Sequence, residues 1–189
     1  MILAGGSSKR MGKDKACLLF GGQTFLDRII SQLDGICDIY LSVGRSDPYA
    51  DDSVIHIQDD YENCGPIGGI QKALNSCQNE VLFVTACDMP LMDSQFAFYL
   101  ASFMEEDVDA VVPVDRDGRK HVLAALYHKR IGRIVESQLQ NGENRVRSVL
   151  EKIRVRYVQI QDHDMEKKLK NVNHLEEYER LVEQDRQLI

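Results

Sequence analysis

The segment from Gly5 to Lys15 combines glycines, hydroxyls and basic side chains in a way that suits a phosphorylated ligand. Glycines let the backbone approach a ligand and turn its N–H groups toward anionic oxygens. Arg10 and Lys15 supply positive charge for phosphate groups. The spacing matches neither the Walker loop nor the dinucleotide-binding fingerprint. Glycine content alone is equally compatible with a tight turn between a strand and a helix, so both interpretations stay open on this segment.

A second chemical candidate is Asp88, which follows a predicted buried strand at residues 81–85. Ligands of parallel α/β sheets bind beyond the carboxyl ends of the strands. Mg²⁺ prefers few carboxylates, completed by phosphate oxygens and water. An aspartate in such a place is also a common turn or helix cap. The basic loop expected on the neighbouring strand end favours a metal ligand over a cap.

Both candidates need a sheet whose strands end along one edge, and the apolar patterning predicts one. Strands are expected at residues 2–4, 39–43, 54–57, 81–85, 108–114, 122–127 and 155–160. Helices are expected at residues 24–33, 67–77, 93–104, 130–139, 145–152 and 175–186. Because strands alternate with helices, we predict an α/β fold with three α/β/α layers and a mostly parallel, twisted sheet.

Composition excludes several classes of function. The 189 residues fit a single domain, residues 1–189, and the formal net charge of -7 disfavours nucleic acid and anionic membranes as partners. No apolar run is long enough to span a bilayer. The five cysteines form no C-x-x-C pair and the five histidines lack zinc-ligand spacing. We therefore expect reduced thiols and a cytoplasmic protein without nucleic-acid or membrane partners.

Residues 3–15 read Leu-Ala-Gly-Gly-x-Ser-x-Arg-Met-Gly-x-Asp-Lys, which resembles the signature of the molybdenum cofactor guanylyltransferases (MobA family). These enzymes belong to the nucleotidyltransferases of Rossmann-like, nucleotide-diphospho-sugar transferase-like fold. Residues 65–69, 87–90 and 171–177 resemble three further family segments in the same order, so the resemblance covers nearly the whole chain. The chain departs from the family at His121-Val122-Leu123, where the usual sequence is His-Pro-Thr, and it lacks Thr-Pro after residues 171–173.

The resemblance implies transfer of GMP from GTP to molybdopterin or Mo-molybdopterin, with Mg²⁺ as cofactor and pyrophosphate as second product. Residues 1–105 would form the nucleotide-binding half and residues 106–189 the acceptor-binding half. The implied catalytic residues are Lys15, Asp88 and Arg10, and the metal ligand is Asp88. The implied nucleotide-binding residues are Leu3, Ala4, Gly5, Gly6, Lys15, Asp59 and Asp88, with Asp60 as an alternative to Asp59. Gly6 would lie against the base and favour guanine. Molybdoenzyme maturation proteins are a further implied partner.

Two alternatives stay open beside this hypothesis. A related transferase would use CTP or a different phosphorylated acceptor through the same loop and metal. A nucleotide-binding accessory protein without turnover is motivated by the altered segment at His121, although the retained Lys15 and Asp88 favour catalysis.

In the second half of the chain, each candidate for acceptor binding is also compatible with a purely structural role, such as a solvated surface side chain, a partly buried histidine or a turn residue. They are Arg119, Lys120, His121, Arg145, Arg147, Asn171 and Asn173. Cys87 is interpreted as a packing residue rather than a nucleophile.

Overall fold

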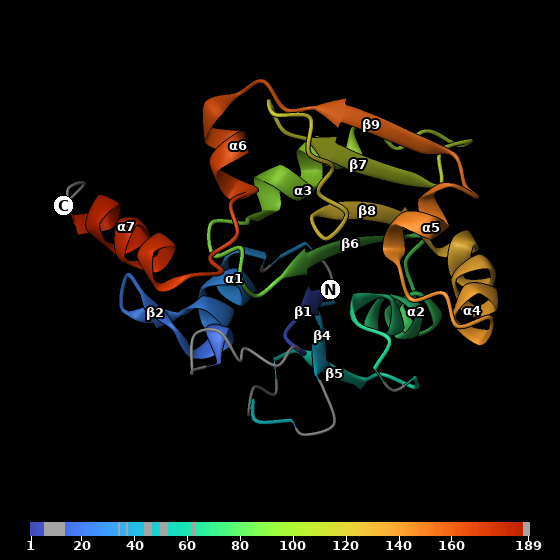
Figure 1. Ribbon diagram of the computed structural model, residues 1–189, viewed down its shortest axis with the longest axis horizontal. Coiled ribbons are helices and arrows are strands. Elements are labelled where there is room, and N and C mark those ends of the chain that lie inside the picture. Colours follow the sequence, from blue (N-terminus) through green and yellow to red (C-terminus); the bar gives the residue numbers. More distant parts are fainter. Residues whose placement is uncertain are drawn as a thin grey trace.

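The computed structural model describes residues 1–5, 14–33, 35–36, 38–43, 47–49, 53–61 and 63–186, with residues 184–186 described by their backbone alone. A seven-stranded sheet crosses the molecule in the order β5-β4-β1-β6-β8-β7-β9 (Figure 1). Its strands are β1 (Ile2–Leu3), β4 (Tyr40–Val43), β5 (Ile55–Gln58), β6 (Val81–Ala86), β7 (Ala110–Val114), β8 (Ala125–His128) and β9 (Val155–Gln159). All neighbours pair in parallel except those of β8, which runs against β6 and β7. The predicted mostly parallel sheet is confirmed.

Helices cover both faces of this sheet. They are α1 (Phe25–Leu33), α2 (Pro66–Ser76), α3 (Ser94–Ala101), α4 (Gly132–Gln140), α5 (Val146–Leu150), α6 (His163–Lys168) and α7 (Leu175–Arg186), with single 3₁₀ turns η1 (Lys15–Cys17) and η2 (Lys129–Ile131). None of the helices in the described ranges is long and apolar enough to cross a membrane.

Strand alternation explains the three layers. Leu3 packs into a core with α2, α4 and α5, whereas its neighbour Ile2 packs into a second core with α1 and α3. Figure 1 shows α2, α4 and α5 beside each other, with α1 and α3 on the other side of the sheet. The inner parallel strands β1, β4, β6 and β7 are buried on both faces and are mostly apolar, whereas in the edge strands β5 and β9 apolar residues alternate with polar ones.

Two elements were not predicted from the sequence. A hairpin of β2 (Leu19–Phe20) and β3 (Gln23–Thr24) turns at Gly21 and Gly22, whose φ angles of 58° and 82° suit a two-residue turn. Helix α6 is only six residues long, and its N-cap Asp162 accepts from the backbone N–H groups of Asp164 and Met165. Glycine turn geometry specifies the hairpin and a polar cap specifies α6, so the apolar patterning predicted neither element.

A third, small core joins distant parts of the chain near the C-terminal helix. Phe25 of α1 and Phe20 of β2 pack with Val172, which lies ahead of α7. Tyr178 of α7 contacts the Phe25 ring and donates a hydrogen bond to the Leu19 carbonyl at 2.7 Å. This packing holds the segment before α7 against the edge of the sheet where β1 and β6 end.

Candidate active site

Lys15 and Asp88 meet at the point where the sheet reverses its strand order. Since β4 lies on one side of β1 and β6 on the other, the chain ends of β1 and β6 frame the crevice in which α/β folds bind ligands. Lys15 follows the β1 loop and Asp88 follows β6. Their side chains form an ion pair with Nζ to Oδ2 at 3.2 Å, and each side chain is 16% exposed. The predicted proximity of these two residues is confirmed.

Asp14 explains how Lys15 is held in place. It is the N-cap of η1, and its Oδ1 accepts from the Ala16 N–H at 3.0 Å. Its second carboxylate oxygen accepts from the Tyr49 hydroxyl at 2.6 Å. Burial and this hydrogen bond raise the pKa of Tyr49, which keeps the hydroxyl as a donor. The consecutive Asp14 and Lys15 of the sequence motif therefore have different roles. Asp14 fixes the turn, and Lys15 faces the crevice.

Residues 171–173 bring two amides to the same point from far along the chain. Asn171 Nδ2 donates to Asp88 Oδ1 at 3.0 Å, and Lys15 Nζ donates to Asn173 Oδ1 at 2.6 Å. Val172 lies between them, 4% exposed in the third core, and its N–H donates to the Asp88 carbonyl at 2.8 Å. Val172 packs into the third core while the asparagines on either side of it contact Asp88 and Lys15, so the buried valine anchors both amides at the site.

Glu177 of α7 fixes the end of this segment. Its Oε2 accepts from the backbone N–H of Asn173 at 2.6 Å and of His174 at 3.0 Å, which is the carboxylate half of a capping box. These backbone N–H groups hold the pKa of Glu177 below its ordinary value of 4.5. Glu177 thus positions Asn173, which in turn accepts from Lys15.

The residues expected to bind the nucleotide do not all gather around Lys15. Leu3 and Ala4 are buried at the end of β1, and the N–H groups of Ala4 and Gly5 both donate to the Ser42 carbonyl at 3.0 Å. Those two amides are therefore engaged with the neighbouring strand rather than open to a phosphate. Gly6 and Arg10 lie outside the described residues, as does the rest of the basic loop up to residue 13.

Asp59 lies at the end of β5, two strands away from β1 on the same sheet edge. Ser42 donates to its Oδ1 at 3.2 Å, and burial raises the pKa of Asp59 while this hydrogen bond opposes the rise. Two glycines of α2 make room for it, because a Cβ on Gly68 would lie 3.2 Å from Asp59 Oδ2 and one on Gly69 would lie 3.1 Å from Oδ1. Gly68 and Gly69 therefore leave the space that the Asp59 carboxylate occupies.

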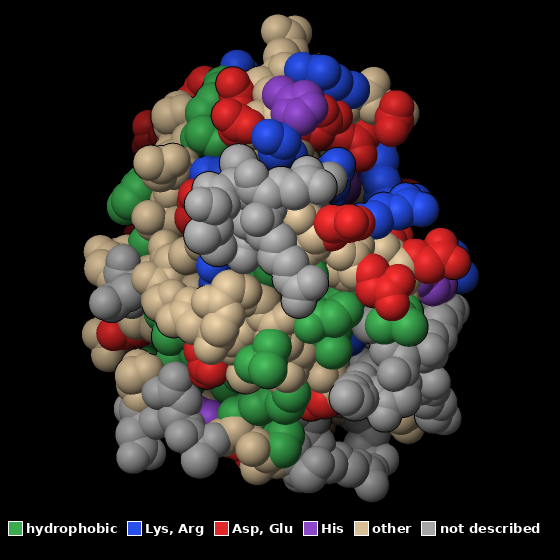
Figure 2. Space-filling model, turned by 90° about the vertical axis from the view of Figure 1, so that its left-hand side faces the viewer, with side chains coloured by type: hydrophobic (Ala, Val, Ile, Leu, Met, Phe, Trp, Pro, Cys, Tyr) green, Lys and Arg blue, Asp and Glu red, His purple; other side chains and the backbone are tan. Residues whose placement is uncertain are grey.

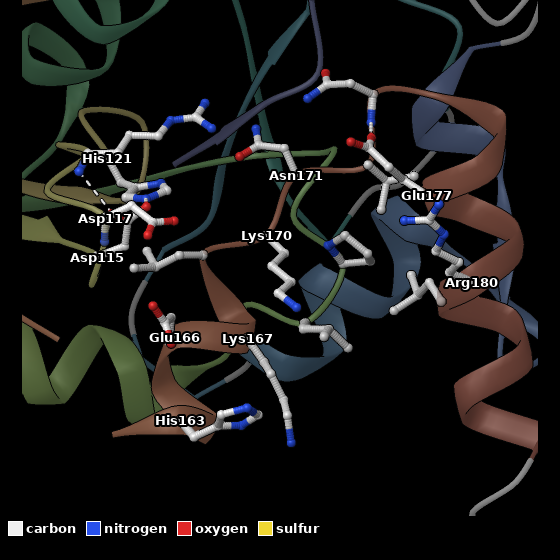
Figure 3. Close-up of a pocket in the computed structure, with 17 residues that line it drawn as sticks. Asp115, Asp117, His121, His163, Glu166, Lys167, Lys170, Asn171, Glu177 and Arg180 are labelled. Carbon is white, nitrogen blue, oxygen red and sulfur yellow. Dashed lines mark hydrogen bonds and ion pairs between the residues drawn. The ribbon is translucent and has the colours of Figure 1, made fainter. Parts of the chain in front are cut away.

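A cleft of about 640 Å³ adjoins the Asp88 cluster on the side of the second half of the chain. Figure 3 shows Asn171 and Lys170 between two walls, with Asp115 and His121 on one side and Glu177 and Arg180 on the other. Arg119 and Lys170 line it, and in the described part of the chain neither side chain is in an ion pair. The cleft therefore offers positive charge to an anionic ligand next to Asp88.

One wall of the cleft is a rigid turn between β7 and β8. Asp115 Oδ1 accepts from the N–H groups of Asp117 and Arg119, while Oδ2 lies 2.8 Å from His121 Nε2. Burial would raise the pKa of Asp115, but the hydrogen bond from His121 and the backbone N–H groups outweigh it, and the pKa is lowered. His121 is held in the cleft wall by this pairing.

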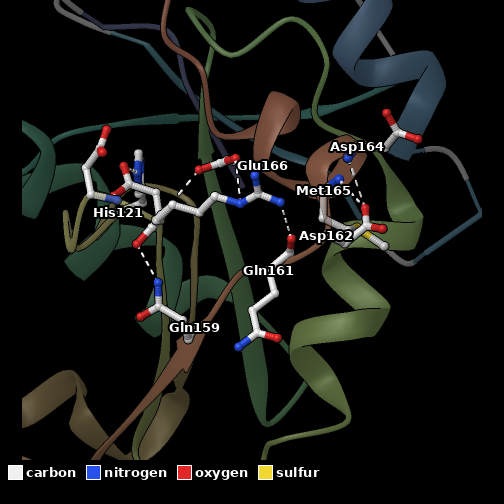
Figure 4. A network of polar contacts seen from close by, with 10 residues as sticks. His121, Gln159, Gln161, Asp162, Asp164, Met165 and Glu166 are labelled. Atoms are coloured by element: carbon white, nitrogen blue, oxygen red, sulfur yellow. Dashed lines mark hydrogen bonds and ion pairs between the residues drawn. The ribbon is translucent and has the colours of Figure 1, made fainter.

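A neighbouring network ties that turn to α6. Arg116 donates from its backbone to Glu166 Oε1 at 3.2 Å and from its guanidinium to the Gln161 carbonyl at 2.5 Å, and Gln159 Nε2 donates to the Asp115 carbonyl at 2.6 Å (Figure 4).

The side of the molecule that carries α7 shows Lys, Arg and His side chains interspersed with Asp and Glu in its upper part (Figure 2). The cleft lining is mixed in the same way, so the positive charge it offers is that of Arg119 and Lys170 rather than of a basic patch.

The oxygen atoms that surround the Lys15 ammonium are of the kind that binds a magnesium ion. Asp88 Oδ2 and Asn173 Oδ1 both lie within 3.2 Å of the Lys15 ammonium, so two hard oxygen atoms converge on one cationic position. Mg²⁺ takes one or two such protein oxygens and completes its shell with phosphate oxygens and water. Within the residues that the structure describes, no three His, Cys, Asp or Glu side chains form a closed metal cluster. A single carboxylate beside an open crevice is the arrangement expected for a metal shared with a phosphate substrate.

Sequence reasoning missed part of this site. Asp115 and Lys170 were not singled out, although Asp115 directly follows β7 at the same sheet edge as Asp88, which the strand-end rule would have revealed. Arg145 and Arg147 do not line the cleft, whereas Arg119 and His121 do. Burial raises the pKa of the Cys87 thiol to about 12, as expected for a packing residue rather than a nucleophile.

The fold and the crevice define a nucleotidyltransferase of Rossmann-like architecture, and the comparisons with known proteins agree. A MobA-like NTP transferase domain matches residues 1–160. The chain is 33% identical to a probable molybdenum cofactor guanylyltransferase of Geobacillus sp. over 96% of both chains. The chain belongs to the MobA-like NTP transferase family.

Solved structures share its fold. The molybdopterin-guanine dinucleotide biosynthesis protein A of Archaeoglobus fulgidus superposes with a TM-score of 0.81 at 20% identity, covering 98% of this chain and 97% of that one. A 2-C-methyl-D-erythritol 4-phosphate cytidylyltransferase of Thermus thermophilus superposes with a TM-score of 0.72 at 12% identity, covering 98% of both chains. Since a cytidylyltransferase shares the fold, the choice of nucleotide depends on side chains.

Proposed function

We propose that the protein transfers GMP from GTP to the terminal phosphate of molybdopterin or Mo-molybdopterin, forming the guanine dinucleotide cofactor and pyrophosphate. The supporting observation is the meeting of Lys15, Asp88, Asn171 and Asn173 at the switch point of the sheet, beside an anion-accepting cleft. Relatives that match nearly the whole chain carry the name "probable molybdenum cofactor guanylyltransferase".

The two halves of the chain have different roles in this proposal. Residues 1–105 bind GTP, with Lys15 contacting the triphosphate and Asp59 facing the nucleoside. A carboxylate matches guanine because it accepts from two neighbouring N–H donors, which cytosine does not present. Residues 106–189 bind the acceptor in the cleft, where Arg119 and Lys170 offer positive charge.

The reaction is an in-line attack of an acceptor phosphate oxygen on the α-phosphorus of GTP. The acceptor oxygen is already ionised at neutral pH, so no general base is required and catalysis consists of alignment and charge stabilisation. Lys15 holds the triphosphate, and Asn171 fixes the orientation of Asp88. The proposed Mg²⁺ would be held by Asp88 and, when bound, would neutralise charge that develops on the phosphate oxygens.

The decisive experiment measures pyrophosphate release from each of the four nucleoside triphosphates, with and without molybdopterin, in the presence of Mg²⁺. We expect release only with GTP and acceptor together, and Asp88→Asn to lose most turnover while keeping the fold. Equal release from CTP, or acceptor-independent binding of GTP without release, would replace the proposal by one of the two alternative functions. Near-normal turnover of Asp88→Asn at saturating Mg²⁺ would remove Asp88 from the mechanism.

A further inference from the structure

The Lys15 ammonium occupies the position at which the metal would be bound. Its Nζ lies 3.2 Å from Asp88 Oδ2 and 2.6 Å from Asn173 Oδ1, the two oxygens that converge in the crevice. The remaining oxygen of Asp88 is already taken, because Asn171 donates to it. Oδ2 is therefore the Asp88 oxygen that faces the cationic position, and in this structure a lysine occupies that position.

We propose that Lys15 is a placeholder cation, which neutralises Asp88 in the absence of substrate and moves onto the triphosphate when GTP enters, so that the metal and the nucleotide bind cooperatively. This inference rests on the metal site of the proposed function. It assigns to Lys15 a second task besides contacting phosphate: it keeps a divalent ion from binding tightly before GTP is present.

Electrostatics supports this exchange. A largely buried carboxylate without a partner is costly, so Lys15 stabilises the site while no metal is bound. A metal arriving alone must separate the ion pair and leave the ammonium close to a dication. A triphosphate removes that obstacle because it gives Lys15 a new anionic partner. Coupling between two ligands is reciprocal, so the nucleotide tightens metal binding and the metal tightens nucleotide binding by the same factor.

The test is metal binding in the absence of nucleotide, with Mn²⁺ as the probe because it shares the oxygen preference of Mg²⁺ and gives an electron paramagnetic resonance signal when free. Full-length wild type, Lys15→Met, Lys15→Gln and the double variant Lys15→Met/Asp88→Asn are titrated in parallel. We expect each single variant to bind Mn²⁺ alone about tenfold more tightly than wild type, within the usual range of couplings. The double variant should lose this gain.

A matched control separates the placeholder role from a general change in charge. Lys170→Met removes a positive charge one position from Asn171 and should leave Mn²⁺ affinity close to that of wild type. Metal-free binding of a non-hydrolysable GTP analogue should weaken in Lys15→Met, opposite to the change in metal affinity, whereas a damaged site would lose both.

Two results overturn the inference. One is Mn²⁺ affinity of Lys15→Met and Lys15→Gln no higher than that of wild type. The other is a gain that persists without Asp88. Failure of the proposed function shows separately, as absence of pyrophosphate release in the GTP assay with wild-type protein.

Discussion

Asn171 donates a hydrogen bond to Asp88 across 83 positions of the chain, with Nδ2 and Oδ1 3.0 Å apart. The neighbouring Val172 N–H reinforces this contact by donating to the Asp88 carbonyl at 2.8 Å. The segment before α7 therefore fixes the orientation of the Asp88 carboxylate. It leaves Oδ2 directed at the crevice, where Lys15 meets it.

The Asn171→Leu substitution tests whether this segment orients Asp88. Leucine has a similar volume but no donor, so Asp88 Oδ1 loses its partner and the carboxylate is free to turn. We expect guanylyl transfer to fall at least tenfold and the free energy of unfolding to drop by about 1–2 kcal/mol. Initial rates and urea denaturation measure the two effects. Asn141→Leu, which removes an amide donor to the Ser137 carbonyl in α4, should lower stability slightly without changing the rate. A wild-type rate in Asn171→Leu would show that the contact has no catalytic role.

Glu177 predicts a pH-dependent contribution to stability. Backbone N–H groups lower its pKa in the folded state below 4.5, so the contribution is complete above that pH and is lost as the pH falls through the folded-state value. Glu177→Gln should be less stable than wild type by about 0.5–1 kcal/mol at pH 7. The difference between the two proteins should shrink as the pH is lowered from 5 to 3, a range chosen at roughly one unit either side of the ordinary glutamate pKa. Thermal unfolding across this range measures it, and a constant difference would contradict the assignment.

The surroundings of Gly69 predict that an alanine at this helical position destabilises the protein. Replacing glycine by alanine inside a helix normally stabilises a protein by about 1 kcal/mol. Here the new Cβ would overlap the Ser42 hydroxyl and lie 3.1 Å from Asp59 Oδ1, so Gly69→Ala should destabilise the protein and weaken GTP binding. Adding Ser42→Ala removes the overlapping oxygen. The double variant should recover stability relative to Gly69→Ala, which a double-mutant cycle in urea measures. Additive effects would place the cause elsewhere.

The sequence predicted the mostly parallel sheet and the location of Lys15 and Asp88 on one edge of it, but it did not predict the ion pair between them. Apolar runs identify buried strands, and the strand-end rule places the residues that follow them on one edge. The bounds of α7 at residues 175 and 186 were also predicted correctly. The hydrogen bonds of Asn171 and Asn173 depend instead on where the chain returns after β9, which the pattern of the segment itself does not contain.

The acceptor side was harder to predict for a physical reason. The cleft is formed by a turn after β7, the short helix α6 and the start of α7. The third core holds α7 in place, whereas the turn and α6 are held by single polar contacts. Such contacts leave almost no periodic signal. Asp115-Arg116-Asp117-Gly118 reads as a turn, and its cap-like hydrogen bonds are typical of aspartate, but its position opposite α7 follows only from the tertiary fold.

The contact between Asp115 and His121 predicts that the Asp115→Asn substitution weakens acceptor binding selectively. Asp115→Asn keeps an oxygen for the turn but removes the negative charge that holds His121 at 2.8 Å in the wall of the cleft. Because the nucleotide crevice lies beyond Asn171, we expect the KM for the acceptor to rise about tenfold, which corresponds to the 1.4 kcal/mol scale of one charged hydrogen bond. The KM for GTP should stay within about twofold, a 0.4 kcal/mol change on the same scale. Steady-state kinetics with each substrate varied in turn separates the two constants. Asp107→Asn is the control, since Asp107 pairs with Arg154 outside the cleft, at an exposed position. An equal rise in both KM values would mean that the pair supports the fold of the whole edge rather than the acceptor site.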